Sequence, residues 1–228
     1  MFVGMLFGAR LLYMAIYYVP APNTTMEWWE PFAIWQGGLS FHGAITGMLL
    51  AAFLFARFYK VPFLSITDSV SLCGYGALFF GRIGNFINAE LYGRITNVPW
   101  GMSFPVRDWY GNLLGWTEPR HPSQIYECIA EGLMCFAIVW MTKKFAKRYG
   151  IITGIGIIAY GILRFICEFF REPDEQIGYL WDKFTMGQLL CAIMVIVGIC
   201  VVLYAKKTQP TFTSTTDELP LKSEKDAN

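Results

Sequence analysis

The sequence predicts an all-α membrane protein, a polytopic helical bundle with six transmembrane spans and one folded outer loop. Hydrophobic residues make up 55% of the 228 residues and charged residues only 15%, whereas soluble chains carry about 25% charged residues. Apolar runs close to the roughly 20 residues that cross a bilayer recur along the chain. The net charge of +1 argues against a nucleic-acid partner, which needs a concentrated basic face.

The first apolar run covers residues 1–19 and is interrupted only by Arg10. We expect it to be a retained span, because no basic segment precedes it and no small-residue cleavage site ends it. Five further spans are expected, at residues 39–55, 69–88, 122–141, 151–170 and 184–204. Residues 94–120 contain several prolines and glycines and are expected to form a folded loop. The segment 206–228 is rich in Thr, Ser, Lys and Glu and is expected to be disordered.

The basic residues predict the orientation of the spans. Lysine and arginine gather in residues 57–66, in residues 143–150 and in the C-terminal segment, which places these ends in the cytoplasm. Both termini are then inside. His42, His121 and the polar groups of residues 82–93 lie toward the outer leaflet, whereas a transporter more often places such groups at the bilayer midplane.

Residues 81–94 end a long apolar run, yet they contain two arginines, two amides and a carboxylate. Wound as an α-helix at about 100° per residue, the stretch would place four side chains within roughly 80°: Arg82, Asn85, Ala89 and Gly93. A cation this deep in an apolar segment costs at least ~2.5 kcal/mol unless it is compensated. We therefore predict a functional site here, with a plain helix-packing face as the alternative.

The fifth span carries polar side chains at helical spacing: Tyr160, Arg164, Glu168 and Arg171. Arg164 and Glu168 can neutralise each other at i,i+4, so a self-satisfied ion pair is one interpretation. The functional interpretation is a cationic cradle for phosphate. Arginine suits that role because its planar fork binds phosphate oxygens and stays charged in a dry site.

The remaining candidate features carry less chemistry by themselves. His42 is followed by Gly43 and Gly47, a GxxxG spacing that favours helix packing, and residues 120–127 are typical of a helix start. In both segments a merely hydrogen-bonded or capping residue is the alternative. Residues 154–159 imitate a dinucleotide fingerprint, but no strand precedes them, so we reject that interpretation. The six cysteines lack metal-ligand spacing, so no metal site, disulfide or cofactor is predicted.

Four motifs occur along the chain in a specific order: FHGAITG at 41–47, GRIGNFINAELYGR at 81–94, RHPSQIYE at 120–127 and RFICEFFREPD at 164–174. Together they resemble the prolipoprotein diacylglyceryl transferases, bacterial membrane enzymes that act in lipoprotein biosynthesis. The resemblance covers residues 7–198. It implies a transferase that moves the diacylglyceryl group of phosphatidylglycerol onto the lipobox cysteine thiol of preprolipoproteins, with residues 1–205 as one catalytic membrane domain.

The resemblance also implies roles for individual residues. Catalytic roles are expected for His42, Arg82, Glu90 and Arg164. Substrate-binding roles are expected for Arg82, Asn85, Gly93, His121, Arg164 and Glu168. His42 is the leading candidate for the general base, because histidine takes up a proton near neutral pH, and Glu90 is the second. The two arginines would hold the phosphate, Asn85 would orient the head group and Glu168 would fix Arg164.

The implied partners are phosphatidylglycerol, membrane lipids and preprolipoprotein signal peptides with a lipobox cysteine. The implied location is the bacterial cytoplasmic (inner) membrane, with the C-terminus in the cytoplasm and the active site toward the outer leaflet. The family usually has glycine in place of Ala89, a change expected to be mild. It also begins with a further membrane helix carrying a His-x-Tyr pattern, and this chain starts after that helix. A reduced non-catalytic paralogue that binds lipid or signal peptide, and a small membrane transporter, are the alternatives.

Overall fold

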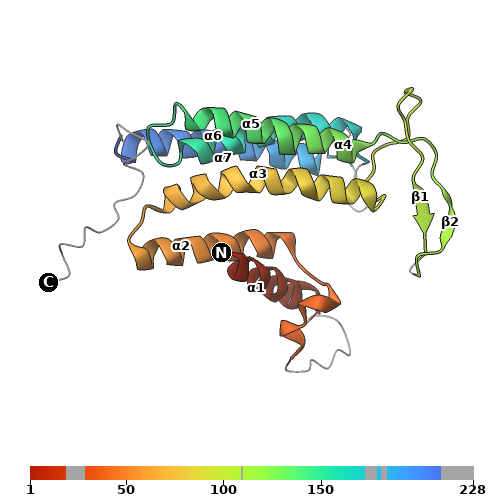
Figure 1. The fold of residues 1–228 in the computed structure, drawn as a ribbon, viewed down its shortest axis with the longest axis horizontal. Coiled ribbons are helices and arrows are strands. Elements are labelled where there is room, and N and C mark those ends of the chain that lie inside the picture. The colour runs from red at the N-terminus through yellow and green to blue at the C-terminus, as the bar shows by residue number, and fades with distance from the viewer. Residues whose placement is uncertain (19–28, 109, 173–178, 181–183, 212–228) are drawn as a thin grey trace. The chain divides into compact units, whose positions relative to one another are not determined.

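The computed structural model describes residues 1–18, 29–108, 110–172, 179–180 and 184–211 and is mostly helical (Figure 1). These residues form two compact units, 1–66 and 67 onward. Among them, five helices are long and apolar enough to cross a membrane: His42–Tyr59, Phe63–Ile87, Ser123–Lys143, Ile151–Phe170 and Met186–Thr208. The apolar helix Phe2–Ile16 is shorter. The polytopic helical fold is confirmed, although the first of the six predicted spans falls below spanning length.

The first unit is built on two helices joined by a loop. Helix α1 (Phe2–Tyr13) continues as the π-helix Met14–Tyr18, the 3-10 turns Glu30–Phe32 and Ile34–Gln36 follow, and α2 covers Phe41–Tyr59. The helices meet through glycines, because a Cβ added at Gly47 would lie 2.8 Å from the Cα of Gly8. Small residues let helix backbones approach closely. The GxxxG spacing of α2 is therefore a packing feature, as predicted.

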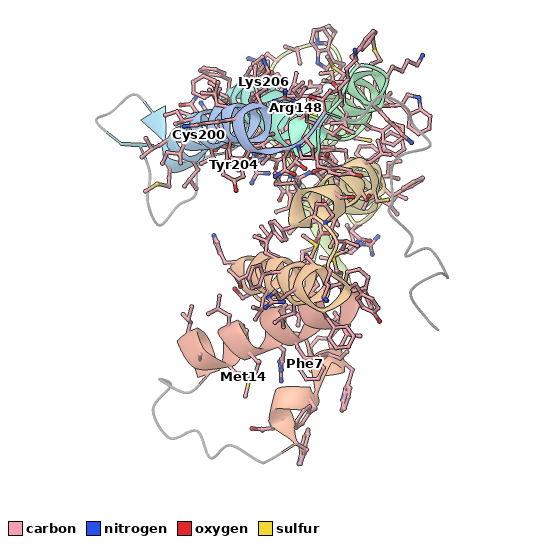
Figure 2. All side chains as sticks on the ribbon, turned by 90° about the vertical axis from the view of Figure 1, so that its left-hand side faces the viewer. Phe7, Met14, Arg148, Cys200, Tyr204 and Lys206 are labelled. Atoms are coloured by element: carbon pink, nitrogen blue, oxygen red, sulfur yellow. The ribbon has the colours of Figure 1, made fainter. Side chains whose placement is uncertain are left out.

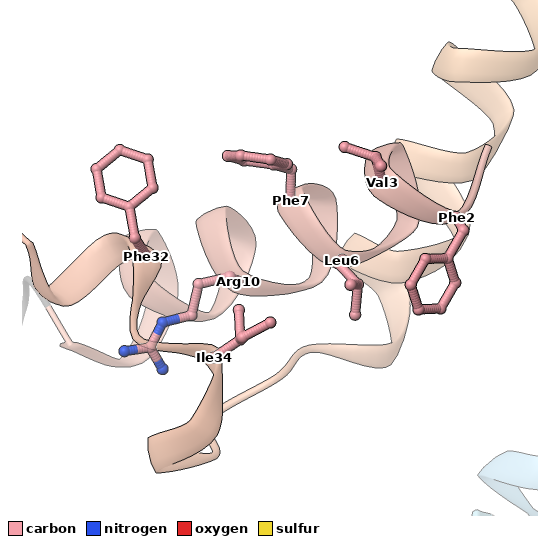
Figure 3. Close-up of a pocket in the computed structure, with 7 residues that line it drawn as sticks. All are labelled: Phe2, Val3, Leu6, Phe7, Arg10, Phe32 and Ile34. Carbon is pink, nitrogen blue, oxygen red and sulfur yellow. The ribbon is translucent and has the colours of Figure 1, made fainter.

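Arg10, the cation that interrupts the first apolar run, is buried and holds the following loop. Its Nη1 donates to the carbonyl oxygen of Gly37 at 2.6 Å, and its Nη2 donates to that of Glu30 at 2.7 Å. Beside it lies an apolar cavity of about 240 Å³, and Figure 3 shows the guanidinium at the end of the lining away from Phe2. Loop carbonyls thus compensate a cation that an apolar helix would otherwise carry at a cost.

The second unit contains the remaining helices. They are α3 (Phe63–Ile87, whose first turn belongs to the first unit), α4 (Ser123–Glu127), the π-helix η4 (Cys128–Met134), α5 (Cys135–Lys143), α6 (Ile151–Cys167), the 3-10 turn η5 (Glu168–Phe170) and α7 (Met186–Thr208). Elements α4, η4 and α5 form one continuous span. The core of this unit joins α3, α5 and α6 through Tyr75, Cys135, Val139 and Ala159.

Glycines of α6 bring its neighbours close. A Cβ at Gly154 would lie 3.0 Å from the carbonyl oxygen of Gly198 on α7, and one at Gly156 would lie 2.9 Å from the hydroxyl of Tyr75 on α3. These glycines serve helix packing. The rejection of a dinucleotide fingerprint in this segment is consistent with their contacts.

Several helix ends differ from the predicted ones. The third span was predicted to begin at residue 69, whereas helix α3 begins at Phe63. Helix α7 extends to Thr208, so Lys206 belongs to the helix rather than to the tail. Figure 2 shows Arg148, Tyr204 and Lys206 at one end of the second unit. Residues 212–228, expected to be disordered, lie outside the described residues, and the single domain expected over 1–205 stays a prediction.

The predicted loop at 94–120 is folded. Strands β1 (Pro105–Arg107) and β2 (Leu113–Trp116) form an antiparallel hairpin, and Arg120 makes isolated bridges to Ile95 and Met102. In the hairpin turn, Asp108 accepts hydrogen bonds from the side chain and the backbone N–H of Asn112 at 2.9 and 2.8 Å. These bonds lower the pKa of the Asp108 carboxyl. Strands β3 (Tyr179–Leu180) and β4 (Phe184–Thr185) form a second antiparallel pair.

A carboxylate of α3 caps the start of α6. Asp68 is buried; its Oδ2 accepts from the backbone N–H of Gly150 at 2.8 Å, and its Oδ1 accepts from the N–H and hydroxyl of Thr153 at 2.8 and 2.6 Å. Gly150 is the N-cap residue and has no side chain to satisfy these donors. Asp68 therefore supplies from a neighbouring helix what an N-cap residue usually supplies locally.

We expect Asp68→Ala to lower the free energy of unfolding by about 1–3 kcal/mol, because buried donors would lose their acceptor. Thermal unfolding of the purified protein in detergent measures this loss. Asp108→Ala, in an exposed turn, serves as the control and should change stability far less. Equal losses of stability in the two variants would mean that the hydrogen bonds of Asp68 to the start of α6 add no stability of their own.

Candidate active site

Six charged side chains of the second unit form one ion-pair network, here named the arginine–glutamate cluster: Arg82, Arg164, Arg171, Glu127, Glu131 and Glu168. Arg82 on α3 donates through Nη2 to Glu131 Oε2 at 3.3 Å. Its Nε lies 2.9 Å from Glu127 Oε2, at an angle too bent for a hydrogen bond. Arg164 on α6 donates through Nη1 to Oε1 of both glutamates, at 2.9 and 3.0 Å.

Glu168, the first residue of η5, extends the cluster beyond the end of α6. Its Oε2 lies 3.1 Å from Nη2 of Arg164, so the predicted i,i+4 pair is confirmed. Arg171 lies 3.7 Å from the same oxygen through Nε and donates through Nη1 to Glu127 Oε1 at 3.0 Å. The other oxygen of Glu168 accepts from the Thr185 hydroxyl at 3.1 Å, which links the start of α7 to the cluster.

The cluster has its carboxylates inside and its arginines nearer the surface. The side chains of Glu127 and Glu131 are 0% exposed, whereas those of Arg82 and Arg164 are each 16% exposed. Within the part of the chain that the structure describes, Arg82 Nη1 and Arg164 Nε have no hydrogen-bond partner. Both arginines are partly exposed, and guanidinium N–H groups without a protein acceptor are donors that phosphate oxygens bind.

An irregular helix presents the two inner carboxylates. Glu127 is the last residue of α4, and Glu131 lies in the π-helix that follows. Short π segments inside α-helices are frequent at functional sites. Gly132 in this segment brings α3 close, since a Cβ there would lie 2.6 Å from the Cα of Phe79. This approach places Arg82, one turn beyond Phe79, over the carboxylates.

The chain turns sharply after α3 ends at Ile87. Ala89 and Leu91 both have left-handed backbones, with φ of 54° and 57°. The expectation that Ala89 and Gly93 continue the helical face of Arg82 is therefore wrong. Buried side chains at the start of α4 hold the turn: Gln124 Nε2 donates to the carbonyl oxygen of Glu90 at 2.7 Å, and Ser123 Oγ donates to that of Leu91 at 3.1 Å. Ser123 thus serves the turn and makes no side-chain cap to its own helix.

The left-handed backbone changes the interpretation of Ala89. Ala89 was expected to be a mild replacement of glycine on a face of small residues. Its positive φ gives a different reason for glycine at this position, because glycine adopts a left-handed backbone without steric cost. We expect Ala89→Gly to raise the free energy of unfolding by up to about 1 kcal/mol, since a Cβ in this region costs about 1–2 kcal/mol and the greater entropy of glycine in the unfolded chain offsets part of that gain.

Ala77→Gly, in the exposed middle of α3, is the matched control and should lower stability by about 1 kcal/mol. The unfolding temperatures of both variants in detergent test this difference. A loss of stability in both would mean that the left-handed backbone at Ala89 is not strained.

The turn supports polar groups that follow Arg82. Asn85 lies one helical turn after Arg82, and its Nδ2 donates to Glu90 Oε1 at 2.8 Å. Gly93 lies in extended backbone: its N–H donates to the His121 carbonyl oxygen at 2.9 Å, and it bridges to Arg171. A Cβ at Gly93 would strike the carbonyl oxygen of Phe170. Only glycine fits here without moving the backbone.

His121 is oriented by two aromatic residues. The indole Nε1 of Trp100 donates to the Tyr126 hydroxyl at 2.7 Å, and that hydroxyl lies 3.2 Å from Nδ1 of His121. Because an indole N–H can only donate, the Tyr126 hydroxyl accepts from Trp100, and the same oxygen is within hydrogen-bond distance of the imidazole. The ring of His121 also packs edge-on against Phe170, with centroids 5.3 Å apart. The imidazole of His121 is thus held between Tyr126 and Phe170.

Comparisons with known proteins identify the family. The family model described as prolipoprotein diacylglyceryl transferase matches residues 1–204. The chain belongs to this family. It is 46% identical over 211 residues to the phosphatidylglycerol–prolipoprotein diacylglyceryl transferase of Wolbachia sp. subsp. Drosophila simulans, covering 89% of this chain and 75% of that protein. Proteins of the same name from Idiomarina loihiensis and Rickettsia felis are 42% and 44% identical, covering 92% and 86% of this chain and 75% and 73% of their own lengths.

The structure brings most of the predicted site of this diacylglyceryl transferase together in its second unit. Arg82, Arg164 and Glu168 share the arginine–glutamate cluster, and the bridge between Gly93 and Arg171 connects the turn to it. Asn85, Glu90 and His121 border the same turn. His42 lies at the start of α2 in the first unit. Its role as base stays a prediction.

Glu127 and Glu131 are missing from the predicted site of the transferase. A charge count over the predicted spans could have found them. Arg82 and Arg164 are two cations within the spans, Glu168 alone cannot neutralise both, and the fourth span offers two acids at i,i+4 spacing. Buried charges in membrane spans pair with one another. The sequence therefore contained the signal, although not the geometry.

Proposed function

We propose that this chain transfers the diacylglyceryl group of phosphatidylglycerol to the lipobox cysteine thiol of preprolipoproteins. The observation that carries the proposal is the arginine–glutamate cluster of a chain of this family, in which two partly exposed arginines are paired with fully buried carboxylates. The names of the relatives supply the two substrates. No metal is needed to bind the phosphate, because the arginines already supply positive charge and directed donors.

At the glycerol carbon, the reaction forms one bond and breaks another. The cysteine sulfur attacks the glycerol carbon that carries the phosphate ester, a carbon–sulfur bond forms and the carbon–oxygen bond to phosphate breaks. The leaving glycerol phosphate gains one negative charge as it departs. The thiol proton passes to a base, because a cysteine with a pKa near 8.5 is largely un-ionised at neutral pH.

Each predicted residue has a place in this reaction. Arg82 Nη1 and Arg164 Nε donate to the phosphate and bind it more strongly as its charge grows, which is how such donors lower a barrier. Asn85 and His121 orient the glycerol head group, and Glu168 aligns the fork of Arg164. His42 is the first candidate for the base and Glu90 the second. Gly93 allows the turn to pack closely against the backbone at Phe170, which connects the turn to the arginines of the site.

The transfer is tested with the purified chain, phosphatidylglycerol in mixed micelles and a lipobox peptide. Transfer gives a peptide that carries a thioether-linked diacylglyceryl group, detected as an increase in mass. Binding of the lipid without this product would favour the non-catalytic paralogue. Passage of a solute across vesicles, again without product, would favour the transporter.

We also propose that the site faces the outer leaflet, with the C-terminus in the cytoplasm, so that lipid and signal peptide enter sideways between helices. The support is the basic-residue pattern of residues 57–66 and 143–150. Asn97→Cys and Ala146→Cys, each in a background without the six native cysteines, are expected to differ. In intact cells a membrane-impermeant thiol reagent should label position 97 and not position 146.

Permeabilised cells provide the control, since position 146 should then react as well. Labelling of position 146 but not position 97 in intact cells would reverse the topology. The cysteine-free background should itself retain transfer, because the nucleophilic thiol belongs to the substrate.

A further inference from the structure

We infer that Glu127 is the residue that positions all three arginines of the site, and that it sets the balance between binding the lipid phosphate and reacting with it. This inference rests on the proposed transfer and adds a residue to its machinery. Glu127 is 0% exposed and ends α4, where the π-helix begins. Such a carboxylate acts on the substrate through the arginines.

The contacts of Glu127 distinguish it from the other carboxylates. Its Oε1 accepts from Nη1 of Arg164 at 2.9 Å and from Nη1 of Arg171 at 3.0 Å. Its Oε2 lies 2.9 Å from Nε of Arg82. One carboxylate therefore contacts arginines from α3, from α6 and from the segment after η5.

The other two carboxylates reach fewer arginines. Among the described residues, Glu131 pairs with Arg82 and Arg164 only, and Glu168 pairs with Arg164 and Arg171 only. Glu127 is thus the one group that fixes the distances among all three forks. A phosphate held by two forks requires those distances to be correct, because misplacement of a reacting group by about 1 Å can cost a hundredfold in rate.

The charges predict an unusual kinetic effect. Three arginines face three carboxylates in the cluster, so the site balances its own charge before an anionic lipid arrives. Removing the charge of Glu127 would free positive charge for the ground-state phosphate and would also release the arginines from their common anchor. Binding would become tighter while the reaction slows, the pattern expected when ground-state interactions gain at the expense of the transition state.

The test is Glu127→Gln, which keeps the shape and removes the charge. With phosphatidylglycerol and a lipobox peptide, we expect kcat to fall about tenfold or more and KM for the lipid to fall rather than rise. Glu127→Asp keeps the charge but shortens the reach, so KM should stay at the wild-type value while kcat falls. A variant that merely unfolds would lose active protein without any change in KM.

Asp68→Asn is the matched control, because it also neutralises a buried acid that accepts several hydrogen bonds, at the other end of α6. It should lower the unfolding temperature and leave KM unchanged. Wild-type kcat and KM in Glu127→Gln, or a raised KM, would overturn the inference while the wild-type transfer stands. Absence of transfer by the folded wild-type chain would instead overturn the proposed function itself.

Discussion

Arg82→Lys is expected to reduce the transfer rate about a hundredfold or more while the protein still inserts and folds. Arg82 uses Nε and Nη2 for Glu127 and Glu131 and has Nη1 left for the phosphate. A lysine ammonium keeps the charge, but as a point charge without a planar fork it cannot hold both carboxylates and align one donor on the leaving group. Loss of a single donor to a developing oxyanion typically costs about 10²–10³ in kcat.

The measurement is the initial rate per folded protein, with Arg57→Lys as the control. Arg57 is exposed in the last turn of α2, so that variant should retain wild-type turnover. Turnover close to wild type in Arg82→Lys would rule out the fork as the phosphate holder and would reduce Arg82 to a source of positive charge.

Gly93→Ala is expected to abolish most of the activity and to lower stability as well. The added Cβ would strike the carbonyl oxygen of Phe170 and come to 3.0 Å from that of His121. The backbone would have to move, and the bridge between Gly93 and Arg171 and the hydrogen bond from Arg94 N to Phe170 O would be lost with it. These contacts connect the turn after α3 to the arginine–glutamate cluster.

Gly101→Ala separates this effect from a general loss in the outer loop. A Cβ at Gly101 would meet the side chain of Thr96 at 3.0 Å, a contact that a small side-chain movement relieves. We expect that variant to keep most of its transfer rate. If Gly93→Ala kept its rate too, the close approach of the backbone at Gly93 to the backbone at Phe170 would be irrelevant to catalysis.

Local patterns predicted what depends on one helix at a time. The pairing of Arg164 with Glu168 follows from i,i+4 spacing, and the glycines of α2 follow from the GxxxG spacing. The helical fold follows from the long apolar runs. In each case the physical cause lies within a few consecutive turns, so the sequence contains all of it.

Features that join separate helices were not predicted. Arg82 meets Glu127 only after α3 packs on the π segment beside Gly132, and no local pattern announces that segment. The turn at Ala89 lacks the glycine or proline that usually marks such a bend, because Ser123 and Gln124 stabilise it from another helix. Asp68 was expected to precede the third span, and the partners that show its role as a cap lie at the start of α6.

The most direct test of the proposed reaction measures where the phosphate of phosphatidylglycerol goes. Phosphatidylglycerol labelled with tritium in the acyl chains and with radioactive phosphorus is incubated with the purified chain and a lipobox peptide for one turnover. We predict that tritium moves to the peptide cysteine while the phosphorus label is released as water-soluble glycerol phosphate, in equal amounts, and that Arg82→Lys loses both signals together. Both labels on the peptide would show that the thiol attacks the phosphorus and not the glycerol carbon, and would contradict the role given to the arginines.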